Sequence, residues 1–312
     1  MKQLTTLKWL LKREIWENKV MLIWSNLVLA GLILLFTLSG IFRLKDVAMN
    51  TDPQTTLQMN DLATAVDHYF TSGLILFSIL MVFTVYSYAT GSLSDERKDR
   101  SILFWKSLPI SDELTVLSKV IVALILFPLM GIITLLLTSL ISIFALCASY
   151  AVHGVGLSSL VFSSHGIWGQ IGHTLKSFPI YVAWALPTVG WMILASSWVK
   201  SRPGMWVILI PFALFVCAAF ANDAVGVNFA RDVAYVLLFR AIFSVVPDSW
   251  SYHYYLNEYG NTLSFPDAIQ HVLLKVDLSS WDIFATPDLW IGVIVGITML
   301  FTAARIRRGR GD

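Results

Sequence analysis

The chain has 312 residues, of which 56% are hydrophobic and only 13% charged, and its formal net charge is +2. A soluble domain carries about 25% charged residues, so this chain has too little polar surface to cover a water-soluble globule of its size. The composition excludes a soluble protein and predicts a chain that lies mostly in lipid. No nucleic acid is expected as a partner.

Six stretches are long and apolar enough to cross a bilayer, which takes about 20 residues of helix. They predict an all-α integral membrane protein with one transmembrane domain over residues 1–312. The third stretch is longer than one crossing needs and contains Pro128, so we expect it to tilt, kink or project beyond the membrane. The six predicted spans are Val20–Phe42, Tyr69–Thr90, Val116–Ala148, Phe178–Val199, Pro203–Ala221 and Asp288–Ala304.

The segment before the first span, residues 1–19, is basic and amphipathic. Leu4, Leu7, Leu11 and Ile15 recur at helical spacing, which predicts a helix that lies in the membrane interface. The apolar run after it is too long for the hydrophobic region of a signal peptide, and no small-residue cleavage site closes it. We therefore expect this run to be retained as the first span.

Basic residues predict the orientation, because cytoplasmic loops of membrane proteins carry an excess of Lys and Arg. With the N-terminus inside, 16 of the 22 Lys and Arg residues lie in the cytoplasm and both termini face it. The six that remain outside are Arg43, Lys45, Lys176, Arg231, Arg240 and Lys275.

The long outer connection, residues 222–287, contains one more apolar stretch, Val233–Val246. It is short and includes Arg240, so a re-entrant or interfacial helix fits it better than a crossing. The alternative, a seventh span, would place the Arg-rich C-terminus outside, against the charge rule.

The cores of the six predicted spans contain no Asp, Glu, Lys, Arg or His, and the only charges lie at the span ends. Ion-coupled carriers need ionisable or polar ion sites at membrane depth, so an ion-driven carrier is disfavoured. There is no HExxH, GxSxG or GxxxxGK[ST] motif, so neither these hydrolase sites nor a nucleotide site of its own is expected. No metal site is expected, because the histidines lack ligand spacing. Cys147 and Cys217 are interpreted as buried, inert thiols, with a disulfide between them as the alternative.

The loop between the second and third spans, residues 91–115, is the most informative part of the chain. A charged run from Asp95 to Arg100 is followed by the apolar run Ile102–Trp105, and Leu108-Pro109 ends the helix. Ser111 can then cap the next helix. This pattern predicts a short helix from about Arg100 to Leu108. Its exposed apolar side chains fit either a protein contact or a lipid-facing position.

The run LSDERKDRSILFWKSLPIS, which ends at Ser111, resembles the loop between the second and third spans of ABC-2 type transporter permeases. The resemblance is specific over Ser94–Ser111 and extends to the architecture: an N-terminal interfacial helix, six spans, a cytoplasmic coupling helix and a re-entrant outer helix. It implies that the loop seats in a groove of a separate ATPase subunit. The implied contact residues are Glu96, Arg97, Arg100, Ile102, Leu103, Phe104 and Trp105.

By this resemblance the chain is the permease subunit of an ATP-driven ABC exporter in a bacterial cytoplasmic membrane, and not itself an enzyme. ATP and Mg²⁺ would be bound by the partner ATPase, with no cofactor in this chain. Six spans form half a pore in that family, which implies a second permease protomer, as a homodimer or with a similar permease.

Two other functions remain open on the sequence. The chain could be a membrane anchor or sensor that holds a cytoplasmic partner without transport. It could also be an outer-face enzyme using Asp248, His253 or Glu258, although the aromatic residues around them are typical of an interface belt. The uncharged span cores suggest an apolar or amphipathic cargo, but no substrate-binding residue is identified.

Overall fold

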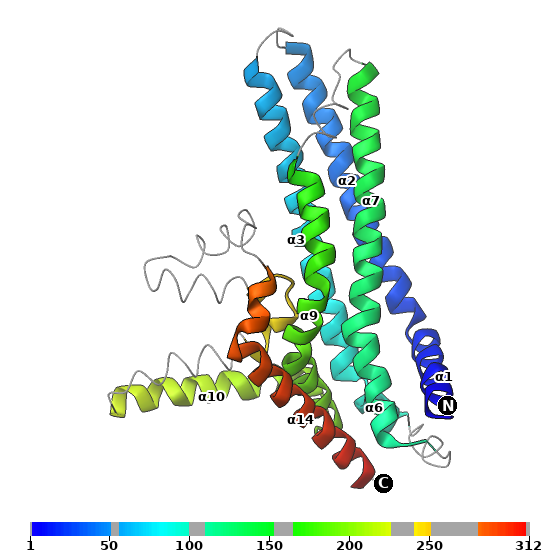
Figure 1. The fold of residues 1–312 in the computed structure, drawn as a ribbon, viewed down its shortest axis with the longest axis vertical. Coiled ribbons are helices and arrows are strands. Elements are labelled where there is room, and N and C mark those ends of the chain that lie inside the picture. Colours follow the sequence, from blue (N-terminus) through cyan, green and yellow to red (C-terminus); the bar gives the residue numbers. More distant parts are fainter. Residues whose placement is uncertain are drawn as a thin grey trace.

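The structure is a computed structural model that describes residues 2–50, 56–99, 110–152, 165–225, 240–250 and 280–309. All secondary structure in these ranges is helical (Figure 1). The predicted all-α class is therefore confirmed for the described part of the chain. Its elements are α1 (Lys2–Glu17), α2 (Lys19–Asn50), α3 (Thr56–Gly91), α4 (Ser94–Lys98), α6 (Asp112–Ile121), η1 (Val122–Leu126), α7 (Phe127–Val152), α9 (His165–Trp198), α10 (Pro203–Val225), η3 (Phe243–Val245), η5 (Ser280–Ala285) and α14 (Pro287–Gly309).

Five helical segments in the described ranges are long and apolar enough to cross a membrane, which makes this a multi-pass membrane protein. Each coincides with a predicted span, and many of their large apolar side chains are exposed, as lipid-facing residues are. The segments are Lys19–Phe42, Ser72–Lys98, Asp112–Ser149, Gly172–Trp198 and Pro287–Gly309.

The fifth predicted span, Pro203–Ala221, forms a helix, α10, but the structure does not show it as a crossing. Within the described residues its apolar part, Pro203–Cys217, is shorter than the five spans, although α10 itself runs from Pro203 to Val225. Figure 1 shows α10 running crosswise to α2, α3 and α7 and reaching away from the bundle. The chain turns sharply before α10, where Arg202 has a positive φ of 51°. A sixth crossing therefore stays a prediction.

The third predicted span is one continuous helical run made of α6, η1 and α7. Its middle is a wide π-helical turn, η1, which ends just before Pro128. Proline lacks an N–H group, and its ring clashes with the carbonyl four residues earlier, so a wider turn accommodates it. A π-helical turn is thus the response to Pro128 that the structure shows, and a tilt, a kink or a projection beyond the membrane stays a prediction. Helices α2, α3 and α7 extend past the start of α9 (Figure 1).

The core of the bundle is built around α9, whose buried residues include Ile180, Trp184 and Ile193. On one side α14 approaches α9 so closely that side chains are excluded. A Cβ atom on Gly190 would lie 2.9 Å from the carbonyl oxygen of Gly296. Small residues allow such contact between membrane helices, where van der Waals packing drives association. The α9–α14 contact thus depends on glycine at these two positions.

Candidate functional site: a buried ionic cluster

Both termini of the described chain lie at one end of the bundle, here called the terminal end, together with α1, α4 and α6 (Figure 1). Of the predicted partner-contact residues, Glu96 and Arg97 are described and belong to α4. The other five, with the predicted short helix from Arg100 to Leu108, lie outside the described residues: Arg100, Ile102, Leu103, Phe104 and Trp105.

Glu96 is buried, with a side chain only 7% exposed, and is surrounded by three cations. Its Oε1 atom lies 3.0 Å from Nη2 of Arg13 and 3.0 Å from Nζ of Lys119. Its Oε2 atom accepts a hydrogen bond of 2.9 Å from Nη1 of Arg307. A buried carboxylate costs several kcal/mol unless it is paired and hydrogen-bonded, and these three contacts offset that cost.

A second buried carboxylate, Glu14, extends the network into α1. Lys119 donates to its Oε1 at 2.9 Å, and the Tyr88 hydroxyl donates to its Oε2 at 2.7 Å. Arg307 also donates to Asp112 at 2.9 Å. We define the ionic cluster as Arg13, Glu14, Tyr88, Glu96, Asp112, Lys119 and Arg307. It contains three cations and three carboxylates, so its formal charges balance.

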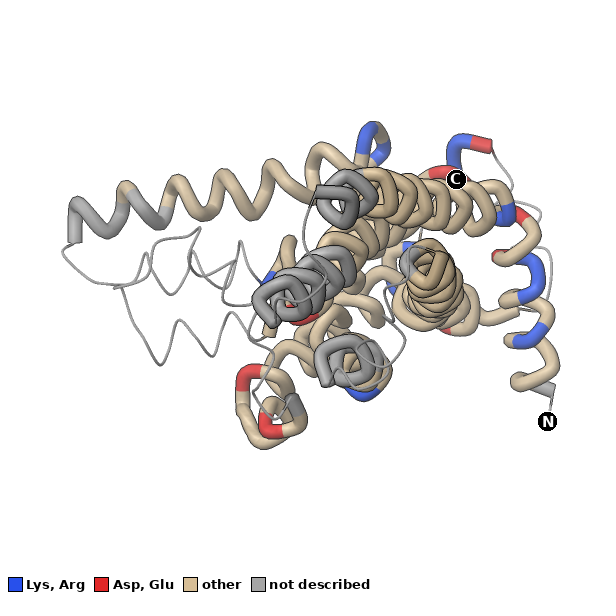
Figure 2. Tube along the Cα trace, turned by 90° about the horizontal axis from the view of Figure 1, so that it is seen from above, with Lys and Arg blue, Asp and Glu red and all other residues tan. Residues whose placement is uncertain are grey.

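The ionic cluster joins five helices that come from the beginning, the middle and the end of the chain. It takes residues from α1, α3, α4, α6 and α14, and its longest contact, Glu96 to Arg307, spans 211 positions. In Figure 2 most charged positions gather on the side that carries the two termini, whereas the long helices are largely uncharged. The cluster therefore fastens the terminal end of an otherwise apolar bundle.

Arg97, the next residue after Glu96, contacts the end of α9. Its guanidinium donates to the carbonyl oxygens of Ser197 at 2.5 Å, Val199 at 2.7 Å, and Ser196. The last carbonyls of a helix lack intrahelical partners and carry partial negative charge, so a cation stabilises them. The Ser196 hydroxyl in turn accepts hydrogen bonds of 3.0 Å from the backbone N–H groups of Leu93 and Ser94.

The two ends of the segment between α4 and α6 are held by one arginine. Glu96, before this segment, and Asp112, after it, both contact Arg307 at 2.9 Å. Ser111 caps α6 as predicted, accepting a hydrogen bond of 3.3 Å from the backbone N–H of Leu114. The loop at residues 91–115 is therefore held to α14 near its start by Glu96 and near its end by Asp112. Contact of Glu96 and Arg97 with a partner stays a prediction.

Most of the ionic cluster was missed in the sequence analysis, although one signal was present. Glu14 follows Leu7 and Leu11 at helical spacing, so it falls on the apolar stripe of α1. A carboxylate in such a stripe indicates a buried partner. The sequence does not show that this partner is Lys119.

Other expectations have mixed outcomes. Cys147 is half-buried and Cys217 is exposed, and both are free thiols. The interpretation of Cys217 as buried is therefore wrong, because it lies on the outer surface of α10.

Of the alternative enzyme residues, Asp248 is described, whereas His253 and Glu258 lie outside the described residues. Within the described ranges, no three His, Cys, Asp or Glu side chains gather as a metal site would need.

Comparison with known proteins gave no match: no protein-family model, curated protein or solved structure matches this chain.

Proposed function

We propose that this chain is the membrane-spanning permease subunit of an ATP-driven ABC exporter and works with a separate ATPase subunit. The observation that carries the proposal is the anchoring of the charged loop. Glu96 and Asp112 tie both ends of the loop to Arg307 of α14, and Arg97 ties its start to the end of α9.

Because the loop is anchored to several helices, a partner that moves the loop would also move those helices. A partner that moves the loop would act on α4 and α6, and through the ionic cluster on α1, α3 and α14. Helices α9 and α14 are packed backbone to backbone at Gly190 and Gly296, so they would move together. Displacement of one short loop could thus shift most of the bundle.

The finer sequence predictions belong to this proposal. The terminal end faces the cytoplasm of a bacterium, α1 lies in the membrane interface, and Val233–Val246 is re-entrant. Helix α10 crosses the membrane as the fifth of six spans in the assembled transporter, where a second permease protomer and lipid cover its exposed side chains. Trp206, Phe212 and Phe220 are among these exposed residues. ATP and Mg²⁺ are held by the ATPase subunit.

The test is co-purification of the full-length chain with the ATPase encoded beside it. Phe104→Asp and Trp105→Asp together are expected to abolish association, because the proposed apolar anchors become charged. The matched control, Phe104→Leu with Trp105→Leu, keeps an apolar surface and is expected to retain most of the association. Association that survives the aspartate pair would contradict the proposed contact.

Reconstitution separates transport from the alternative, a membrane anchor or sensor. An exporter complex hydrolyses ATP faster when its cargo is present, so a panel of amphipathic compounds should contain at least one that stimulates hydrolysis. An associated complex that responds to none of them, and exports none from vesicles, would favour the anchor.

A further inference from the structure

Helix α1 lies across the terminal end of the bundle. Figure 2 looks along the long helices, and it shows the helix that begins at the N-terminus from the side, whereas the long helices are seen nearly end-on. Helix α1 packs against α6 and the beginning of α2. One side of α1 therefore faces the bundle, and the other side faces outward.

The inward side of α1 takes up much of the apolar stripe that the sequence predicts to lie in the membrane interface. Leu10 is only 4% exposed, and Leu11 packs against the hydrophobic core. Glu14, one turn further along this side, belongs to the ionic cluster. Leu4 and Ile15 remain exposed, so the predicted stripe is divided between the bundle and the outside. Contact of α1 with a membrane therefore depends on its outward side.

The outward side of α1 carries alternating tryptophan and lysine residues. Trp9 and Trp16 are 62% and 67% exposed, and the lysines are exposed as well. Steps of three and four residues separate Trp9, Lys12, Trp16 and Lys19, so these side chains follow one line on the helix surface. We define the basic aromatic face as Lys8, Trp9, Lys12, Trp16 and Lys19.

The charge of the basic aromatic face is entirely positive. The sequence of α1 contains two carboxylates, and neither belongs to this face. Glu14 pairs with Lys119 in the ionic cluster, and Glu17 pairs with Nε of Arg13 at 2.8 Å. Nζ of Lys12 lies 5.1 Å from the centroid of the Trp9 ring, a cation–π distance that keeps a cation beside an aromatic ring. Charge complementarity therefore requires an anionic partner.

The position of the face indicates that this partner is a lipid surface. Lys19 is the first residue of the first span, so the face ends where the chain enters the membrane. Exposed apolar side chains continue directly beyond it, with Val20 at 58% and Trp24 at 62% exposed. Tryptophan rings accumulate at the boundary between hydrocarbon and headgroups, and lysines near this boundary are attracted to anionic lipids.

We propose that the basic aromatic face binds anionic phospholipids, with its tryptophan rings between the headgroups and its lysines on the phosphate groups. The proposal goes beyond the interfacial position of α1, because it names the lipid class that this helix selects. It requires neither transport nor an ATPase, so it can fail while the proposed function stands.

The test uses the purified full-length protein in phosphatidylcholine bilayers, with spin-labelled phosphatidylglycerol or phosphatidylcholine as the probe. Electron paramagnetic resonance measures the share of each probe that the protein immobilises. The parent should prefer phosphatidylglycerol by about twofold or more, because each lysine near an anionic headgroup adds to the attraction. Salt at about 1 M should weaken this preference, since it screens exposed charges.

Substitution of the three lysines locates the preference on α1. Lys8→Gln, Lys12→Gln and Lys19→Gln together should remove most of it, because the positive charge of the face is lost. The matched control replaces the same three residues by arginine, which keeps the charge, and should retain the preference of the parent. An unchanged preference in the glutamine variant, or no preference in the parent, would overturn the proposal.

Fluorescence tests the two tryptophans separately from the lysines. The signal of Trp9 and Trp16 is the difference between the parent and the variant that carries Trp9→Phe and Trp16→Phe. Phosphatidylglycerol brominated at carbons 6 and 7 of one chain should quench this signal more strongly than the same brominated phosphatidylcholine. A signal that acrylamide quenches in water and neither brominated lipid quenches would also overturn the proposal, and would assign the face to a protein partner.

Discussion

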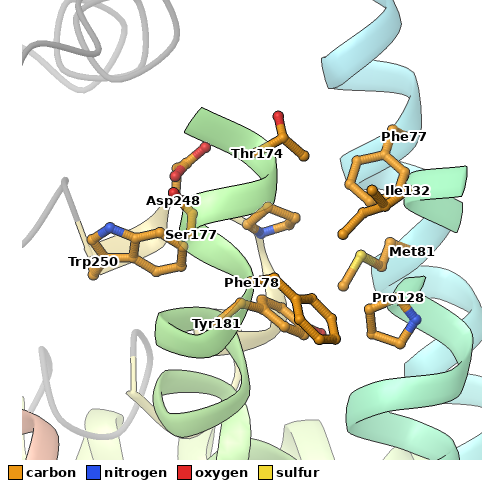
Figure 3. Close-up of a pocket in the computed structure, with 11 residues that line it drawn as sticks. Phe77, Met81, Pro128, Ile132, Thr174, Ser177, Phe178, Tyr181, Asp248 and Trp250 are labelled. Carbon is orange, nitrogen blue, oxygen red and sulfur yellow. The ribbon is translucent and has the colours of Figure 1, made fainter. Parts of the chain in front are cut away.

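In the ionic cluster, every charged side chain lies within 3.0 Å of an opposite charge, whereas the cleft between α3, α7 and α9 is lined mostly by apolar and aromatic side chains, with Tyr181 among them (Figure 3). Both regions contact the helices of one bundle, and both bury polar groups. Their difference is informative because buried charges need opposite charges close by, whereas an apolar lining is stabilised by packing. The ionic cluster is thus interpreted as an internal anchor.

The largest effect is expected from Glu96→Ala, which removes the central carboxylate of the ionic cluster. Arg13, Lys119 and Arg307 would each lose a partner, and breaking a buried ion pair costs about 3–5 kcal/mol. The free energy of unfolding, measured by SDS titration with circular dichroism in mixed micelles, should fall by that amount. The control is Asp95→Ala, since Asp95 forms an exposed pair with Lys98 and accepts a hydrogen bond of 3.3 Å from the Ser94 hydroxyl, and its loss should cost at most about 1 kcal/mol. Equal losses in the two variants would show that the cluster is no anchor.

A smaller loss is expected from Gly190→Val, which tests the connection between the two regions. The new side chain would meet the carbonyl of Gly296 at 2.9 Å, a backbone atom that cannot give way without moving α14. Overpacking of this kind typically costs about 1–3 kcal/mol. Since α14 carries Arg307 at one end and accepts the Arg240 contact at Asp288 near the other, both regions should be disturbed.

Gly31→Val on α2 is the matched control, because a Cβ atom there would meet nothing within 4 Å. The unfolding free energy should fall much less than for Gly190→Val. If the two valine variants behave alike, the close approach of α9 and α14 does not contribute to stability.

Local patterns in the sequence predicted the helices well. The apolar runs gave five spans that the structure contains, and the Leu4, Leu7 and Leu11 spacing predicted α1. Ser111 was recognised as a cap because its partner, Leu114, is three residues away. Features of this kind depend on neighbours within one or two helical turns, which a single sequence shows directly.

The arrangement of these helices could not be predicted in the same way. Arg307 pairs with Glu96 across 211 positions, and no periodicity shows which distant charges meet. The length of an apolar helix does not define its tilt, so the crosswise course of α10 was also missed. Tyr181 falls inside the predicted span Phe178–Val199, and its burial against α3 and α7 becomes visible only in three dimensions.

The smallest effects come from a pair of matched tyrosine substitutions, which compare the two regions with the same chemical change. Tyr88→Phe removes a hydrogen bond to the Glu14 carboxylate, and such a bond to a charged group is worth at least about 1.5 kcal/mol. Tyr181→Phe removes a buried hydroxyl that bonds to no described residue, so its cost should stay within about 0.5 kcal/mol. Both changes are measured as free energies of unfolding.

A loss of stability in Tyr181→Phe as large as that in Tyr88→Phe would assign the Tyr181 hydroxyl an internal partner. The cleft would then resemble the ionic cluster, and the contrast between the two regions would disappear.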